Sequence, residues 1–484
     1  MIENPGKDNE KRWKCELGPD IFQKGPLTEF GGEGAVEEFE CLREATKGLV
    51  VGSAIPTMAM RPGASALVPL LRYFPTLVDL LKQGSELTGT FEAYMNGPNF
   101  VVKDQWLRDW LDALAFSLSG LPAARTSAAA MAFVLDDMHR AGAALDYPRG
   151  GLGEVIDALV RGLEQGNNGS KLYLRHHVET IDFSEDVSKV TGITLKNGRK
   201  ILAKDGVICN APVWSLNGLL ADPKAKRKLN AFLDLKDRVP RQSWESSNDG
   251  SYIQMQQPQT KDQEESLLFK CDTAEMTGSF LHLHVAINAT GLDMDSMEAH
   301  YTVMDRGLMG DGSNVNGVRD GPCGELNMIA LSNPCVIDKT LAPEGYMILH
   351  AYGAGNEPYH VWEGMKRNAP QYAKLKEERA EVLWRAMESI IPDVRDRVVL
   401  DMVGSPLTHE RFLRRPRGTY GAATEDYLKD GSTPVSNFVL AGDSIFPGIG
   451  VPAVAISGAS AANGLVNPLE QWKTLDSLKE QGRL

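Results

Sequence analysis

Apolar residues recur every three or four positions in the first third of the chain. This spacing predicts helices over residues 33–47, 61–83 and 103–141. Pro69 and Pro75 should break or kink the second of these, which is the most lipophilic stretch. It is open to two interpretations: a pair of core helices, or an amphipathic surface that dips into a membrane monolayer. Residues 1–34 are expected to form loops.

The pattern changes to alternating helix and strand after residue 146. Apolar residues at 155, 156, 159 and 163 predict a helix over 154–165. The pattern predicts strands over 171–174, 178–183, 190–195, 199–203, 204–210, 280–287, 327–332 and 346–351. It also predicts a helix over 371–389. Residues 305–325, rich in Gly, Asp and Asn, are expected to be a flexible insertion. This order indicates an α/β protein.

The last module carries candidate chemistry. A strand over 437–441 runs into Gly442 and Asp443, and a turn over 444–450 precedes a helix of small side chains over 451–465. Asp443, at the carboxyl end of a strand, can accept hydrogen bonds from ribityl or ribose hydroxyls. The partial positive charge of the helix N-terminus favours an anionic group. The segment therefore suits a bound cofactor, although a surface turn before an alanine-rich core helix explains the pattern equally well.

The glycines of this turn resemble a phosphate loop without being one. Gly448 and Gly450 let the backbone approach a planar ring, and Pro452 fits the first turn of a helix. The run 448–453 matches G-x-G-x-x-A. However, its glycines do not follow directly after the strand, and too little chain remains for a second strand–helix unit. We therefore reject a Rossmann phosphate loop here.

Composition narrows the function classes. The 484 residues, enough for roughly two or three domains, include 51 basic and 64 acidic residues, and the net charge of -13 argues against a nucleic-acid partner. A local basic patch remains at Arg411, Arg414, Arg415 and Arg417, to which we assign no catalytic role. The six cysteines form no C-x-x-C pair and are expected to be reduced structural thiols inside a cell. We expect no membrane-spanning helix and no secretory signal.

One further pair of residues could form a site. His282 and His284 share one face of a predicted strand, a plausible metal pair, but the sequence shows no third ligand at a suitable spacing. We therefore predict no metal site and interpret them as structural histidines. No G-x-S-x-G occurs, so a serine hydrolase has no support.

Several segments resemble the family of carotenoid isomerases and bacterial-type phytoene desaturases. They are FVLAGDSIFPGIGVPAVAISGASAAN (438–463), DYPRGGLGEVIDALVRGLE (146–164), LYLRHHVETI (172–181), VICNAPVWSLNGLL (207–220), GNEPYHVWEG (355–364) and LTHERFLRRPRGTYG (407–421). The resemblance implies a glutathione-reductase-like FAD domain interleaved with a substrate-binding domain of helices and a mixed sheet. It also implies FAD contacts at Val178, Asn210, Ala211, Gly442, Asp443, Gly450, Val451 and Pro452.

The chain departs from that family pattern at its start. The resemblance implies an N-terminal strand–G-x-G-x-x-G–helix unit and an acidic ribose ligand, and this sequence has neither. We expect either an incomplete sequence, the explanation we favour, or a short form that has lost tight FAD binding. In either case the core should contain a gap. The expected regions are 1–145 (helical, facing substrate and membrane), 146–222 and 401–484 (FAD domain) and 223–400 (substrate domain).

The resemblance implies three functional hypotheses. The first is an FAD-dependent cis–trans isomerase of a lipophilic, carotenoid-like polyene, or a related desaturase, beside a plastid membrane. The second is a flavin-free carotenoid- or lipid-binding or regulatory protein. The third is a carotenoid hydratase or isomerase without redox chemistry. Catalytic residues are not assigned.

Overall fold

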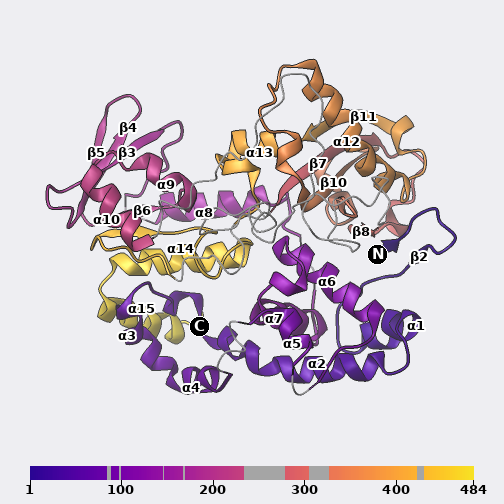
Figure 1. The fold of residues 1–484 in the computed structure, drawn as a ribbon, viewed down its shortest axis with the longest axis horizontal. Helices are drawn as coiled ribbons and strands as arrows, with labels where there is room; N and C mark the ends of the chain where they lie inside the picture. Colours follow the sequence, from indigo (N-terminus) through magenta and orange to yellow (C-terminus); the bar gives the residue numbers. More distant parts are fainter. Residues whose placement is uncertain are drawn as a thin grey trace, which may run out of the picture.

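The computed structural model describes residues 1–83, 89–97, 100–144, 147–166, 169–233, 278–304, 326–421 and 430–484. It confirms the mixed α/β class: within these ranges, helices accompany a seven-stranded, a three-stranded and a two-stranded sheet (Figure 1). The predicted insertion at 305–325 lies outside the described residues, as do Cys271 and Cys323. The four described cysteines are free.

Helices of the amino-terminal part form a bundle of their own below the large sheet in Figure 1. The helix predicted over 33–47 is confirmed, and the region predicted over 103–141 forms two helices separated by residues 120–127. The stretch 61–83 is broken by a 3₁₀ turn between two helices. The helices to residue 139 are α1 (Thr28–Phe30), α2 (Ala35–Val50), α3 (Leu67–Leu70), α4 (Phe74–Gln83), α5 (Phe91–Met95), α6 (Gln105–Ser119) and α7 (Ala128–His139). The later helices are α8 (Gly153–Gln165), α9 (Val213–Leu219), α10 (Pro223–Leu233), α12 (Pro370–Glu388), α13 (Pro406–Leu413), α14 (Val451–Leu465) and α15 (Pro468–Glu480).

The seven-stranded sheet has the order β11-β7-β10-β9-β8-β1-β2. Its strands are β1 (Ile2–Glu3), β2 (Lys11–Arg12), β7 (Ser279–Asn288), β8 (His300–Met304), β9 (Met328–Ser332), β10 (Tyr346–Glu357) and β11 (Val398–Gly404). Alternate residues of β7, such as Leu281, Leu283 and Val285, join the buried core that includes Val382 and Leu383 of α12. One face of the sheet is therefore packed on a helix, as expected for an alternating strand.

The first 34 residues contain two short strands and a short helix in addition to the loops that we expected. β1 pairs in parallel with β8, with Ile2 opposite Val303, and β2 pairs antiparallel with β1. Ile2 is buried in the sheet's core. These two-residue strands escaped prediction because two residues are too few to show a period.

Two smaller sheets lie on the opposite side of the molecule. β3 (Val178–Phe183), β4 (Val190–Leu195) and β5 (Lys200–Leu202) form an antiparallel meander, while β6 (Val207–Cys209) pairs in parallel with β12 (Phe438–Leu440). The strand predicted over 171–174 is wrong: these residues are irregular and end in a turn. Three apolar residues in a row (172–174) imitated a strand, but their side chains are exposed.

The helix predicted over 154–165 is confirmed as α8, but its apolar face is not buried. None of its residues is buried, and Ile156, Leu159 and Leu163 are exposed together with Leu152 just before it. Near it in Figure 1 the parallel sheet consists of two short strands. Parallel strands are normally covered on both faces, so this side of the fold presents an incompletely covered apolar surface.

A buried aromatic cluster holds the helical bundle together. Phe22 stacks on Trp110 with ring centroids 4.1 Å apart, and Phe39 packs edge-on against His139 at 5.2 Å. His139 is 2% exposed. Burial, and then the nearby Arg43, lowers the pKa of His139 to about 4. This imidazole is therefore neutral inside the cluster at pH 7.

That buried histidine should make stability fall in weak acid. Because the pKa of His139 is lower in the folded state than its ordinary value of 6.5, its contribution is complete above pH 6.5 and is lost as the pH falls toward 4. We expect His139→Leu to flatten the decline in melting temperature between pH 7 and pH 5. His176→Gln, at an exposed loop histidine, is the matched control. Equal pH dependence in His139→Leu and the wild type would contradict this expectation.

Candidate functional site

The carboxyl ends of β6 and β12 meet, as the resemblance implied for two segments far apart in the sequence. The Ala441 N–H donates to the Cys209 carbonyl oxygen at 2.9 Å. This register places Asn210 and Ala211 beside Gly442 and Asp443. Because both strands point the same way, the residues that follow them share one edge of the sheet.

Gly442 sits where a side chain would not fit. Its φ is +119°, and a Cβ atom there would lie 2.6 Å from Asn210 Oδ1. Its N–H donates to Ser457 Oγ on α14 at 3.0 Å. The glycine thus fixes a close approach between the end of β12, residue 210 and α14.

Asp443 forms an ion pair that the sequence did not reveal. Arg415 Nη2 contacts Asp443 Oδ2, and the two side chains are only 24% and 12% exposed. Arg415 also donates to the carbonyl oxygens of Thr419, at 3.3 Å, and Tyr420. Arginines in a charge run resemble a solvated surface, so only the tertiary structure shows that one of them is the partner of the strand-end carboxylate.

The loop that carries Arg415 lies against the glycine-rich turn. A Cβ atom on Gly421 would lie 2.2 Å from Ile449 Cγ2 and 3.9 Å from Asp443 Oδ2. Gly448 and Gly450 have φ values of +106° and +100°, and α14 begins directly afterwards at Val451 with an exposed side chain. The turn thus presents backbone and the N-terminus of a helix toward open space.

Val178 is the one predicted cofactor contact that stands in another sheet. It begins β3 and pairs with Leu195 of β4. Asn210, Ala211, Gly442 and Asp443 gather at the ends of β6 and β12, and 450–452 form the turn and the start of α14. All eight contacts remain proposals. Seven of them lie either at the ends of β6 and β12 or in the turn that leads into α14.

These residues fit the ribityl and ring end of a flavin. The strand-end carboxylate offers an acceptor for hydroxyls, the positive-φ glycines allow close backbone approach, and the N-terminus of α14 carries partial positive charge. The G-x-G-x-x-G turn that would hold a pyrophosphate does not occur in the sequence.

The face of the large sheet that lies away from α12 carries aromatic rings and imidazoles, and His409 of α13 packs against it. Phe280 packs edge-on against Tyr420 with centroids 4.7 Å apart and stacks on His409 at 5.3 Å. On β10, Tyr352 lies opposite His282 of β7. We call this surface the aromatic face; it comprises Phe280, His282, Tyr352, His409 and Tyr420. Tyr420 belongs to the loop of Arg415, so the aromatic face adjoins the Arg415–Asp443 pair.

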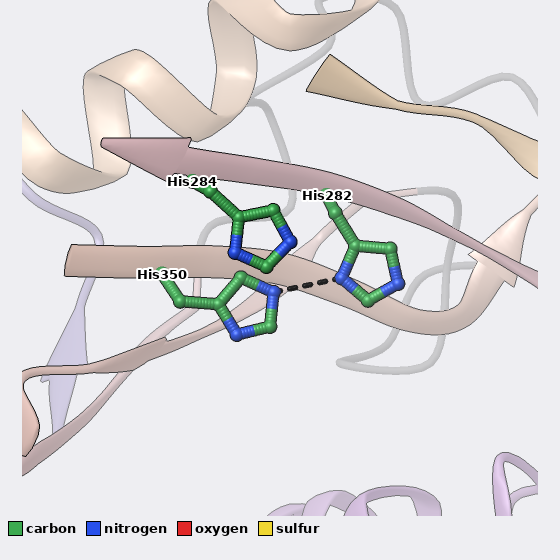
Figure 2. A group of neighbouring side chains, drawn as sticks. All are labelled: His282, His284 and His350. Carbon is green, nitrogen blue, oxygen red and sulfur yellow. Dashed lines mark hydrogen bonds between the residues drawn. The ribbon is translucent and has the colours of Figure 1, made fainter. Parts of the chain in front are cut away.

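The prediction that His282 and His284 share a face of a strand is confirmed, and the structure adds a third imidazole. His350 of β10 lies directly opposite His284 (Figure 2). Its Nε2 is 2.7 Å from His282 Nδ1, and the His284 and His350 rings stack with centroids 4.1 Å apart. Burial is the main cause that lowers the pKa of His282 to about 2 and of His350 to about 3; it also lowers the pKa of His284.

The comparisons with known proteins agree with the family resemblance. Residues 81–285 match the family described as flavin containing amine oxidoreductase. Prolycopene isomerases from chloroplasts match over three quarters of this chain: 32% identity over 369 residues for a protein of an Oncidium hybrid cultivar, 31% over 370 residues for Daucus carota and 29% over 369 residues for Arabidopsis thaliana. The chain covers 53%, 50% and 52% of these proteins, so it spans about half the length of the curated relatives it matches.

Solved structures resemble the fold less closely. An oxidoreductase from Methanosarcina mazei shares 17% identity, with a TM-score of 0.46 over 83% of this chain and 75% of its own. A putrescine oxidase double mutant shares 16%, with a TM-score of 0.46 over 99% and 80%.

The chain is therefore a mixed α/β protein with a region, residues 81–285, that is similar to flavin containing amine oxidoreductases. The chain is also related over 75% of its length to prolycopene isomerases. These findings confirm the family predicted from the motifs and support FAD as the cofactor.

Proposed function

We propose that this protein is an FAD-dependent cis–trans isomerase of a carotenoid-like polyene. The observation that carries the proposal is the gathering of Asn210, Gly442 and Asp443 at the ends of two parallel strands, in a chain related to prolycopene isomerases. Reduced flavin, when bound, supplies electron density that lowers the order of a conjugated double bond, so rotation needs no net redox change.

The chain's own residues would hold and orient the reactants. Asp443 accepts hydrogen bonds from the ribityl hydroxyls, and Arg415 fixes the orientation of the Asp443 carboxylate. The N-terminus of α14 favours a negatively charged ring. The aromatic face offers apolar area to a polyene, which has no polar group to pair with.

The test is conversion of prolycopene by the purified chain with added FAD under reducing, anaerobic conditions. Geometric isomers are separated by chromatography, and product mass is measured. An isomer of unchanged mass supports the proposal. Loss of two hydrogens would instead indicate desaturation, and gain of one water would indicate hydration. Unchanged substrate in the presence of bound flavin would contradict all three.

A second candidate is a flavin-free carotenoid-binding or regulatory protein. The exposed apolar side of α8 favours it. Stoichiometric pigment binding by protein without flavin, with no isomerisation after FAD is added, would establish this alternative in place of the enzyme.

We further propose that the enzyme takes its substrate from a membrane surface in a plastid, because its relatives are chloroplast proteins. Among the described helices, none is long and apolar enough to cross a bilayer. However, Leu67, Leu71 and Phe74, spaced as on one side of a helix, are 67%, 61% and 59% exposed. Such a ridge suits insertion into the interface of a monolayer.

Replacing these three residues with serine should weaken binding to lipid vesicles. Burial of each large apolar side chain contributes about 1.5–3 kcal/mol, so we expect at least a tenfold loss in a flotation assay. A matched control replaces Val399, Leu400 and Met402 of β11, which are 57%, 56% and 57% exposed. Equal vesicle binding by the two triple variants would contradict a specific membrane face at 67–74.

A further inference from the structure

Three histidines gather on the face of the large sheet that lies away from α12, and one of them, His282, also belongs to the aromatic face. His282 and His284 project from the same side of β7, and His350 projects beside them from β10. One ring nitrogen from each lies within 4.8 Å of the others (Figure 2). We propose that His282, His284 and His350 form a binding site for one divalent transition-metal ion.

The antiparallel register brings the ligands together. His284 and His350 are directly opposite each other, and residues in that relation have Cβ atoms about 4.5–5.5 Å apart. His282 is two residues from His284, so it returns to the same face. Three imidazoles are therefore fixed on two paired strands, which is a more rigid support than a loop.

Both ring nitrogens of His282 contact another imidazole, and one choice of tautomer turns the lone pair of Nδ1 toward the proposed metal position. Its Nε2 lies 2.6 Å from His409 Nε2, and its Nδ1 lies 2.7 Å from His350 Nε2. A neutral imidazole carries one N–H. When the His282 Nε2–H donates to His409, the lone pair of Nδ1 faces His350. His409 then accepts the hydrogen bond that orients His282. Ligand histidines in metal sites are usually oriented by such a hydrogen bond from their second ring nitrogen.

Three imidazole ligands favour a transition-metal ion over Mg²⁺ or Ca²⁺. Imidazole nitrogen suits Zn²⁺, Co²⁺, Ni²⁺ and Cu²⁺, whereas Mg²⁺ and Ca²⁺ prefer oxygen. Tetrahedral zinc with Zn–N distances of about 2.0–2.1 Å places its nitrogens about 3.3 Å apart. Metal binding would therefore widen the contact between His282 Nδ1 and His350 Nε2, while small rotations would bring His284 into the same sphere. The His284 ring is exposed, so a water molecule can occupy the fourth coordination position of the metal.

The experiment uses the whole chain, purified without a polyhistidine tag, stripped with chelator and titrated with Co²⁺. Visible absorption bands of bound Co²⁺ should saturate at about one equivalent per chain. Zinc content after dialysis gives an independent count by elemental analysis. Bound metal should also raise the melting temperature, because a ligand of the folded state stabilises it.

Variants separate the ligands from the orienting residue. His350→Ala and the more conservative His350→Gln should each lose the cobalt bands, and His409→Ala should weaken affinity about 10- to 100-fold with the same stoichiometry. His176→Ala, at an exposed loop histidine, should change nothing. Circular dichroism confirms folding of each variant. Absence of saturable metal binding in the wild type, or equal binding by folded His350→Gln, would overturn the proposal and leave a hydrogen-bonded imidazole chain.

Discussion

Glu357→Gln is expected to lower the free energy of unfolding by about 3–5 kcal/mol, the cost of breaking a buried ion pair from one side. Glu357, at the end of β10, is 0% exposed and pairs with Arg379 of α12 through both carboxylate oxygens, at 2.7 and 2.8 Å. Trp362 Nε1 also donates to it at 2.6 Å. The variant would remove the negative charge of Glu357 from the buried Arg379 guanidinium.

The matched control is Glu381, which lies on α12, the helix that carries Arg379. Glu381 of α12 pairs with Arg395 at 2.7 Å, but these side chains are 48% and 41% exposed. Exposed pairs contribute about 0–1 kcal/mol, so Glu381→Gln should change the urea midpoint little. If both variants shifted the midpoint equally, burial would not be the cause of the Glu357 effect.

Asp443→Ala is expected to weaken FAD binding about 10- to 100-fold. Hydrogen bonds to a charged group contribute about 1.5–3 kcal/mol, and the change also removes the partner that holds Arg415 against the glycine-rich turn. Flavin fluorescence quenching measures the affinity. Asp443→Asn, which keeps an acceptor oxygen but loses the charge, should fall between the wild type and the alanine variant.

Arg411→Ala is the control for that experiment. Arg411 belongs to the same basic run, on α13, but its guanidinium lies over the Phe412 ring instead of Asp443. Its removal should leave FAD affinity within about twofold, as for most surface substitutions. Flavin affinity that is unaffected by Asp443→Ala would remove this carboxylate from the cofactor site.

The sequence predicted those elements whose pattern is local. β7 and α12 are predicted close to their observed bounds because alternation is clear over residues 280–287 and helical spacing is clear over residues 371–389. β1 and β2 were missed because a distant strand, β8, stabilises them. α8 was predicted as a helix, but its exposed apolar side could not be foreseen, because burial depends on what lies against it.

In the candidate site, too, the residues with a local sequence pattern were predicted, and the contacts between distant residues were not. Asp443 and Gly450 carried a local signal in a strand–turn–helix pattern, and Asn210 entered by resemblance. The partnership of Arg415 with Asp443 spans 28 positions, and His350 lies 68 positions from His282. Neither pairing has a spacing that a single sequence reveals. Both depend on the register of strands and on the fold of loops.

The division into domains stays a proposal that the pairing of β6 with β12 supports. That pairing joins the segments 146–222 and 401–484. The proposed boundary at residue 400 divides β11, which belongs to the large sheet through residue 404.

The absorption spectrum of the purified 484-residue chain, recorded while FAD is added and unbound FAD is removed, tests the central claim most directly. The account predicts a retained oxidised-flavin band that saturates with added FAD and diminishes in Asp443→Ala. A folded chain that retains no flavin, even at high FAD concentration, would contradict a flavin site at the ends of β6 and β12.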